Sequence, residues 1–335
     1  MERLASVDLC SGAGGLALGL ERAGFDPVLL LDNKPIACET LRHNRPAWNV
    51  VELDLLDFDP VEYPVAYDVD LLSAGLPRVK SPATTKRVET GLELRLLKAT
   101  VLLAHAIQPK AVLIENVPDL VDSAQFEEVR SYIQSELSHL GYRFHWFILN
   151  AADFGVPQDR KQGLLVALKE PHFDRFHPPA PTVTEHTTAG EALLPSMSSR
   201  GWTGAAEWAL QAGRVAPTLV GGSDKRGGAD LGPTGTKNLW AQMGINGSAL
   251  SDEVPGPTGT QESDTSGSRL KKLTVEQTAV LQSFPEGWVF AGKKTARYRQ
   301  IGHASPPPAG EAVGAAIAAA LRGDGATDQG RSNRL

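Results

Sequence analysis

Short apolar runs alternate with stretches of helical spacing along the first half of the chain. The runs are rich in Val, Leu and Ile, which is typical of buried strands. Strands that alternate with helices predict a mostly parallel α/β sheet with helices on both faces. The predicted strands are residues 4–10, 26–32, 50–54, 69–73, 111–116, 142–151 and 162–168, and the predicted helices are 15–23, 36–44, 93–107 and 124–140.

The pattern changes near Pro178. From there to about Arg269 the chain is rich in Gly, Ser, Thr and Pro, which predicts either a disordered stretch or a recognition region built of loops. The tryptophans at 202, 208 and 240 favour order in part of it, and a short helix is expected at 237–243. Helical spacing returns at 274–283 and 309–322. The expected organisation is a cofactor and catalytic domain at 1–177, a recognition domain at 178–270, a segment at 271–323 that returns to the large domain, and a disordered tail at 324–335.

Composition narrows the class of protein. The 335 residues are 41% hydrophobic and 21% charged, which excludes a fibrous or largely disordered chain. No apolar run approaches the roughly 20 residues that span a bilayer, and the N-terminus does not resemble a secretion signal. With only Cys10 and Cys38, neither a disulfide framework nor a cysteine-based zinc site is expected, and no metal is predicted. The expected location is cytoplasmic.

Three features at strand ends predict a nucleotide or nucleoside site. The glycine-rich turn at 11–15 lies between a predicted strand and a predicted helix, and its glycines let a ligand approach the backbone. Asp32, after the second strand, can bind a ribose diol, and Asp54, after the third, can accept from an adenine amino group. The alternatives are an ordinary tight turn for 11–15 and helix capping for the two acids.

Six segments, in order, resemble the motifs of the DNA cytosine-5 methyltransferase family. The resemblance covers roughly residues 4–322. It implies a Rossmann-like, S-adenosylmethionine-dependent methyltransferase sheet, a smaller loop-rich target-recognition domain, and a cleft between them for double-stranded DNA. It also implies that a base is flipped out of the duplex, and that a C-terminal helix returns beside the first motif. The segments are DLCSGAGGLALGLERAGF at 8–25, SAGLPRVKSP at 73–82, ENV at 115–117, FGVPQDR at 154–160, APTLVGG at 216–222 and YRQIGHASPP at 298–307.

The same resemblance implies a set of cofactor-binding residues. Cys10 stands where the family usually has an aromatic residue that packs on the cofactor, so S-adenosylmethionine is the expected cofactor with its binding left open. His303 stands where the family usually has an asparagine after glycine. The implied set is Asp8, Cys10, Ser11, Gly12, Gly14, Gly15, Asp32, Asp54, Leu76 and His303.

The resemblance also implies which residues surround the target base. In the family, a cysteine thiolate after the fourth strand attacks carbon 6 of the flipped cytosine, a glutamate bonds N3 and the exocyclic amine, and an arginine holds O2. Arg78 occupies the cysteine position, and a guanidinium cannot act as a carbon nucleophile. Gln162 replaces the second arginine of the family's Gln-x-Arg-x-Arg motif. The implied catalytic set is Glu115, Arg78, Asn116, Arg160 and Gln162.

Basic residues in two segments are candidates for contact with DNA. The net charge of −6 gives no overall argument for nucleic acid, but phosphate contacts need only a local basic face. One group lies in the segment after the fourth strand and the other in the recognition region. The candidates are Lys80, Lys86, Arg87, Lys225, Arg226 and Lys237.

The missing cysteine governs the expected function. We expect a DNA-binding, base-flipping protein, associated with the nucleoid, that has lost methyl transfer and can act beside an active methyltransferase or a nuclease of a restriction or defence system. One alternative is altered chemistry on a flipped base, either glycosylase-like or deaminase-like, with Glu115 and Arg78 as the acting groups. Another is residual cytosine-5 methylation through Cys10 or Cys38. A small-molecule or RNA methyltransferase is less consistent with the last two motifs.

Overall fold

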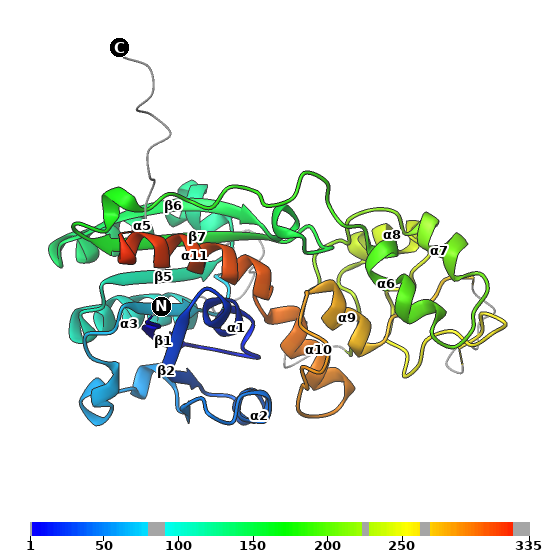
Figure 1. Cartoon of the computed structure of the whole chain (residues 1–335), viewed down its shortest axis with the longest axis horizontal. Coiled ribbons are helices and arrows are strands. Elements are labelled where there is room, and N and C mark those ends of the chain that lie inside the picture. Colours follow the sequence, from blue (N-terminus) through cyan, green and yellow to red (C-terminus); the bar gives the residue numbers. More distant parts are fainter. Residues whose placement is uncertain (1, 80–90, 223–227, 262–268, 324–335) are drawn as a thin grey trace, which may run out of the picture.

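A seven-stranded sheet forms the centre of the computed structural model, which describes residues 2–79, 91–222, 228–261 and 269–323 (Figure 1). The strand order is β3-β2-β1-β4-β5-β7-β6. The first five strands pair in parallel, and β7 pairs antiparallel with both β5 and β6. The predicted α/β, Rossmann-like sheet is confirmed. The strands are β1 (Leu4–Leu9), β2 (Phe25–Asp32), β3 (Val50–Glu52), β4 (Leu71–Gly75), β5 (Ala111–Asn116), β6 (Tyr142–Asn150) and β7 (Lys161–Lys169).

Helices cover both faces of this sheet. In β5, Val112 and Ile114 pack in one buried cluster with helices α3 and α5, while Leu113 packs in another with α1 and α11. Successive side chains of a strand point to opposite faces, so a strand buried on both faces reads as an apolar run, as residues 111–114 of β5 do. The helices of this part are α1 (Gly15–Arg22), α2 (Pro35–Asn44), α3 (Gly91–Ile107), α4 (Asp119–Asp122), α5 (Glu127–His139) and α11 (Pro307–Arg322).

The last helix lies directly against the first. A Cβ atom on Gly15 would come within 2.0 Å of the carbonyl oxygen of Ser305, and one on Gly19 within 2.5 Å of that of Pro307. Only glycine permits this approach. The glycines of α1 therefore make room for the chain that leads into α11, and the two helices lie side by side although they come from opposite ends of the sequence (Figure 1).

The Gly- and Ser-rich region at 178–269 is folded where the structure describes it, so disorder across the whole of this region was a wrong alternative. The short helix expected at 237–243 is present and begins three residues earlier. Three further helices were not predicted: α6 has a proline inside it, α7 is short, and α10 is largely polar. The helices are α6 (Ala189–Ser198), α7 (Ala205–Gln211), α8 (Thr234–Gln242), α9 (Val275–Leu281) and α10 (Lys294–His303).

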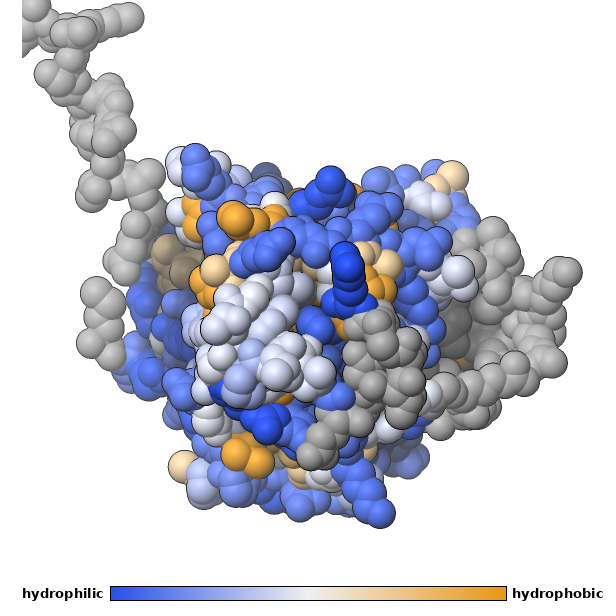
Figure 2. All heavy atoms as spheres, turned by 90° about the vertical axis from the view of Figure 1, so that its right-hand side faces the viewer, coloured by the Kyte–Doolittle hydropathy of each residue, from blue (hydrophilic) through white to orange (hydrophobic). Residues whose placement is uncertain are grey.

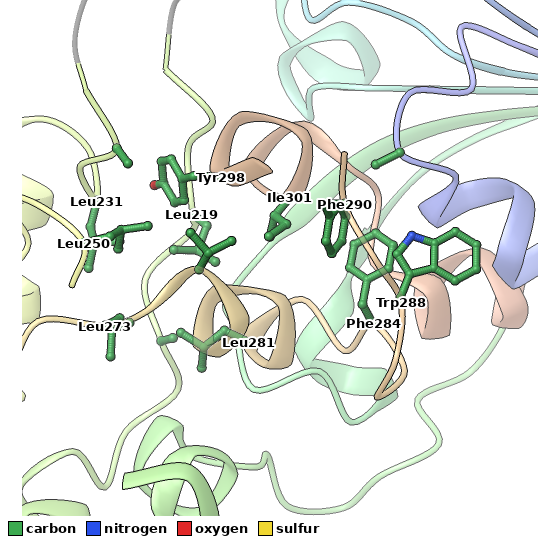
Figure 3. Close-up of a cluster of buried hydrophobic side chains, with 14 of the residues drawn as sticks. Leu219, Leu231, Leu250, Leu273, Leu281, Phe284, Trp288, Phe290, Tyr298 and Ile301 are labelled. Carbon is green, nitrogen blue, oxygen red and sulfur yellow. The ribbon is translucent and has the colours of Figure 1, made fainter. Parts of the chain in front are cut away.

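A continuous hydrophobic cluster supports this half. Figure 3 shows Leu231, Leu250 and Leu273 at one end of it and Phe284 and Trp288 at the other, with the side chains of α9 and α10 between them. Trp288 would lie 3.2 Å from a Cβ atom on Gly14, so the cluster reaches the turn that follows β1. Packing of this cluster therefore fixes the shape of that turn.

The surface at the α6–α8 end is mostly hydrophilic, with isolated hydrophobic residues (Figure 2). Among the described residues, no helix is long and apolar enough to cross a membrane. Short 3-10 turns complete the structure: Leu55–Asp57, Pro60–Glu62, Pro64–Ala66, Ala124–Phe126, Ala151–Phe154 and Phe173–Arg175.

Candidate active site

The carboxyl ends of the parallel strands bring the predicted site residues to one edge of the sheet. Strand β1 lies between β2 and β4, so the chain runs from β1 to its neighbours on one side and later returns to pair on the other side of β1. Ligands of open α/β sheets bind in the crevice that this reversal creates. Cys10, Asp32 and Glu115 stand at the ends of β1, β2 and β5, around this crevice.

The turn after β1 uses its glycines in two ways. Gly12 and Gly14 have positive φ angles of 53° and 84°. A Cβ atom on Gly14 would lie 2.6 Å from Leu41, whereas nothing lies within 4 Å of one on Gly12. Gly12 therefore leaves its backbone open to a ligand, while Gly14 and Gly15 serve close packing. Cys10 also has a positive φ, of 55°, which is strained for a residue with a side chain.

Asp32 holds the turn against the end of β2. Its carboxylate accepts hydrogen bonds of 2.8 Å from the backbone amides of Gly12 and Lys34. Burial raises the pKa of the carboxyl, and these two hydrogen bonds oppose the rise. Each oxygen keeps a further lone pair, so the residue can still accept from a ribose hydroxyl.

Asp54 caps the helical turn that follows it, which was the alternative interpretation of this residue. Its carboxylate accepts from the backbone amide of Leu56 at 3.0 Å, capping a 3-10 turn, and from the side-chain amide of Asn33 at 3.0 Å. Its contact with an adenine amine stays a prediction. Leu76, at the end of β4, is buried.

Asp8 is a buried acid with an unsatisfied oxygen. Ser73 donates to its Oδ1 at 2.6 Å, and Oδ2 has no hydrogen-bond partner among the described residues. Burial raises the pKa of Asp8 to about 6. The hydroxyl of Ser11 donates to the backbone carbonyl of Asp8 at 2.9 Å, which fixes the first residue of the turn. An orphan acceptor beneath the turn fits a site that takes a hydrogen-bond donor.

Asn116 holds the segment that carries Arg78 by hydrogen bonds. Its Oδ1 accepts from the backbone amide of Val79 at 3.0 Å and from that of Val117 at 2.9 Å, and its Nδ2 donates to the carbonyl of Pro77 at 3.3 Å. Because the carboxamide is buried, these bonds are shielded from water. The asparagine therefore positions the 77–79 segment beside the end of β5.

Glu115, Arg78 and Arg160 form a charged cluster next to that segment. Glu115 pairs with Gly75 of β4 in the sheet and is buried. Burial and the charge of Arg78 together lower the pKa of Arg160 to about 9, while the charge of Glu115 opposes the shift. Three of the five predicted catalytic residues are thus close enough to interact.

Arg160 and Gln162 are engaged with the C-terminal part of the chain. Nη1 of Arg160 donates to the carbonyl oxygens of Leu219 and Gly302 at 3.0 and 3.2 Å. Gln162 donates to the hydroxyl of Ser305 at 2.7 Å. Both side chains are buried, so they join the sheet to the loop and helix that follow it. Contact of either with a base stays a prediction.

Gln158 joins the same parts and was not singled out, although it opens the Gln-x-Arg motif. Its Oε1 accepts from the amide of Leu219 at 2.8 Å, and its Nε2 donates to the carbonyl of Leu281 and to Oε1 of Gln282, both at 3.1 Å. Gln282 in turn donates to the carbonyl of Ile301 at 2.7 Å. A fully buried glutamine in a loop needs hydrogen-bond partners of this kind. This need was the signal by which Gln158 could have been identified.

His303 faces the recognition region. Its Nε2 lies 3.0 Å from the carbonyl of Gly222, and a Cβ atom on Gly221 would collide with the ring. Desolvation lowers the pKa of the imidazole, and the charges of Lys34 and Arg78 add to the effect. The ring is therefore neutral at pH 7 and has a packing role here.

Most of the predicted DNA contacts lie outside the described residues: Lys80, Lys86, Arg87, Lys225 and Arg226. Lys237, in α8, is described and pairs with Asp230 at 3.3 Å. In the described part of the chain, no cluster of three or more His, Cys, Asp or Glu side chains could hold a metal ion.

Comparison with known proteins gives consistent matches. The family model of the C-5 cytosine-specific DNA methylases matches residues 4–319. The type II methyltransferase M.NaeI of Lentzea aerocolonigenes is 40% identical over 332 residues, which cover 97% of this chain and 77% of that protein. The type II methyltransferase M.NgoMIV of Neisseria gonorrhoeae is 40% identical over 322 residues, covering 95% and 98%. The crystal structure of the S. pombe Dnmt2 methyltransferase superposes with a TM-score of 0.61 at 17% identity, covering 96% and 99%.

These relatives overturn the expectation that methyl transfer has been lost. Two proteins that share two fifths of their residues with nearly the whole chain are named as type II methyltransferases. A binding protein without methyl transfer was therefore the wrong prediction. The glycosylase-like and deaminase-like alternatives receive no support from them.

Proposed function

Because the chain belongs to the C-5 cytosine-specific DNA methylase family, we propose that it is an S-adenosylmethionine-dependent methyltransferase acting on a base of double-stranded DNA. The observation that carries this proposal is the 40% identity to two type II methyltransferases across nearly the whole chain. The retained strand-end residues support it. A restriction endonuclease is the natural partner of such an enzyme, since methylation then protects the host's own sites.

The residues around β1 fit S-adenosylmethionine. The first turn of α1 offers amide donors for the carboxylate of its methionine part, and the open side of Gly12 lets the ligand approach. Asp32 stands where a ribose hydroxyl would be bound, and Leu76 and Cys10 offer apolar contact near the base of the turn. When bound, the cofactor supplies an electrophilic methyl group. The remaining candidate contacts are Asp8, Ser11, Gly14, Gly15, Asp54 and His303.

The target base is received at the end of β5. Glu115 bonds its Watson–Crick edge, and Asn116 holds the 77–79 segment in place next to it. Arg78 stands in the position of the family's cysteine and contributes a positive charge there. Arg160 and Gln162 hold the parts of the chain that enclose this space.

Sequence recognition belongs to residues 178–270, which we treat as a domain separate from 1–177. The segment 271–323 completes the large domain through the packing of α11 on α1. Phosphate contacts come from Lys80, Lys86, Arg87, Lys225, Arg226 and Lys237. Such contacts predict duplex binding that weakens steeply as salt increases.

Transfer of a labelled methyl group tests the proposal. Purified protein is incubated with duplex DNA of mixed sequence and S-adenosylmethionine labelled in its methyl group, and radioactivity or isotope in the DNA is measured. Label in DNA is expected, and Glu115→Gln should reduce its rate at least a hundredfold. Glu170→Gln, at an exposed ion pair with Arg143, is the matched control and should leave the rate unchanged. No label in DNA by a folded protein would refute the proposal.

Calorimetry tests the cofactor site without turnover. Asp32→Asn should weaken S-adenosylmethionine binding about tenfold or more, because a hydrogen bond to a charged acceptor contributes about 1.5–3 kcal/mol. Asp174→Asn, at the protein surface, serves as control. Equal affinities for the two variants would remove Asp32 from the site.

A further inference from the structure

We infer that Arg45 is a positioning residue for cofactor binding, which holds the turn at 11–15 and helix α1 in the arrangement that receives S-adenosylmethionine. The inference rests on the proposed function and deepens it, since it adds a residue that acts on the cofactor site through its neighbours. Arg45 directly follows α2 and was not singled out in the sequence. Its role follows from the two indole rings and the carboxylate that it contacts.

Two indole rings lie beside Gly14, the residue from which α1 begins. Gly14 has a φ of 84°, in the left-handed region. A Cβ atom on it would lie 3.2 Å from Trp288, 3.7 Å from Trp48 and 2.6 Å from Leu41. Trp48 follows α2, whereas Trp288 lies between α9 and α10, so the two rings come from distant parts of the sequence. The shape of the turn at 11–15 therefore depends on where these two rings are held.

The guanidinium of Arg45 contacts both rings. Its central carbon lies 5.3 Å from the centroid of the Trp288 ring and 5.7 Å from that of the Trp48 ring. The two ring centroids are 6.4 Å apart, and the ring planes are inclined by 57°. A cation within about 6 Å of an aromatic centroid is attracted by the π electrons of the ring. Both indoles are buried, so a single charge holds the two rings together with little competition from water.

Glu21 fixes the guanidinium in turn. Its carboxylate accepts from Nε of Arg45 at 3.0 Å and from Nη2 at 2.9 Å, which is the paired geometry that suits a guanidinium. Nη1 of Arg45 donates to the carbonyl of Asn44 at 3.0 Å. Glu21 lies in the last turn of α1. Arg45 therefore holds α1 at two places: at its last turn through Glu21, and at its first residue through the indoles beside Gly14.

The orientation of α1 decides how well its first turn binds an anion. The amides of that turn bind a carboxylate only when they converge on it. A helix of eight residues is about 12 Å long, so a tilt of about 10° at its last turn moves its first amides by about 2 Å. Hydrogen bonds are lost over such a distance. Loss of Arg45 should therefore weaken cofactor binding, while Glu115, at the end of β5, keeps its place.

Arg22 provides a matched control on the same helix. It pairs with Glu311 of α11 at 3.8 Å, and its side chain is 34% exposed, compared with 35% for Arg45. The two arginines therefore form ion pairs of similar exposure. Arg22 ties α1 to α11, whereas Arg45 ties α1 to the indoles beside the turn. An effect that follows from any lost ion pair of α1 would appear in both variants.

Calorimetric titration with S-adenosylmethionine tests the inference without turnover. Arg45→Ala should weaken binding about tenfold or more, because the site is no longer preorganised. Arg45→Lys keeps a charge near the rings but loses the paired bonds to Glu21, so it should recover part of the affinity. Arg22→Ala should bind as the wild-type protein does. Wild-type affinity in Arg45→Ala, or an equal loss in Arg22→Ala, would overturn the inference.

Steady-state kinetics separates positioning from general damage to the fold. With duplex DNA and labelled S-adenosylmethionine, Arg45→Ala should raise the KM for the cofactor about tenfold and leave kcat within about twofold of the wild-type value. A lower kcat at unchanged KM would overturn the inference and leave the proposed function intact. Absence of methyl transfer by the wild-type protein would refute the proposed function, and the binding titration would still decide the role of Arg45.

A second site of substitution covers the case in which Arg45→Ala does not fold. Trp288→Phe keeps an aromatic ring in the hydrophobic cluster but leaves a gap beside Gly14, so it should weaken cofactor binding severalfold. Trp202→Phe, which packs against Trp208 in the recognition region, is its control and should bind the cofactor as the wild-type protein does. Wild-type affinity in both Arg45→Lys and Trp288→Phe would overturn the inference.

Discussion

The side-chain oxygen of Asn116 and the backbone amide of Val79 are joined by a buried hydrogen bond of 3.0 Å. The bond links the end of β5 to the segment that follows β4. Glu115 precedes Asn116 and Arg78 precedes Val79, so this one bond sets the relative position of these two charged residues.

Asn116→Ala should therefore separate Glu115 from Arg78. Loss of the carboxamide leaves the amide of Val79 and the carbonyl of Pro77 without partners, at a cost of about 1–3 kcal/mol in the free energy of unfolding. We expect methyl transfer to slow at least tenfold. Asn49→Ala, which removes an exposed bond to the carbonyl of Val28, is the control. Equal rates for the two variants in the labelled-methyl assay would contradict this positioning role.

Gly15→Ala should destabilise the protein. The new Cβ atom would lie 2.0 Å from the carbonyl oxygen of Ser305, and the backbone has to move to admit it. Overpacking of this kind costs about 1–3 kcal/mol. Gly235→Ala, where nothing lies within 4 Å, should be neutral or add up to about 1 kcal/mol. Denaturant unfolding of both variants measures the difference, and similar midpoints would disprove the close approach.

Arg160→Lys tests the hydrogen bonds by which Arg160 holds the chain at Leu219 and Gly302. The shorter lysine has one nitrogen in place of Nη1, which donates to the carbonyls of Leu219 and Gly302, and of Nη2, which donates to that of His303, so at least one acceptor loses its partner. The expected loss is about 1–3 kcal/mol. Arg143→Lys, at a surface ion pair, should leave the melting temperature nearly unchanged. The prediction fails if scanning calorimetry gives both variants the wild-type melting temperature.

Asp8 should make stability depend on pH. Its pKa is about 6 in the folded protein and close to 3.8 in the unfolded chain. Between these values the native state binds more protons, so the free energy of unfolding falls as pH rises from about 4 to about 6, by at most about 3 kcal/mol, and is flat above that range for this group. Asp8→Asn should reduce the fall. Urea unfolding at pH 4.5 and pH 7 measures it, and an unchanged difference between the two pH values would exclude Asp8 as its source.

The sheet was predictable because its strands are buried on both faces and read as apolar runs, as β5 does. The strand-end position of Asp32 and Glu115 followed from the same pattern. The helices between residues 178 and 303 were harder to predict. Helix α10 is mostly polar and gains its stability from a few contacts such as Tyr298 and Ile301, which a periodicity does not reveal. The hydrogen bonds of Gln158 could not be predicted either, because its partners lie 61 and 124 residues away along the chain. The loss of methyl transfer was inferred from Arg78 together with departures at Cys10, Gln162 and His303, and the 40% identity to two proteins named as type II methyltransferases outweighs these departures.

The contact between α1 and the chain around Pro307 also sets an order for biosynthesis. The turn at 11–15 is made first, and the backbone that packs on Gly15 and Gly19 is made nearly 290 residues later. At about 5–20 residues per second this delay is on the order of tens of seconds. Throughout that time the small-residue face of α1 lacks the backbone that covers it in the folded protein. The turn at 11–15 therefore acquires its final shape only after the residues around Pro307 have been made.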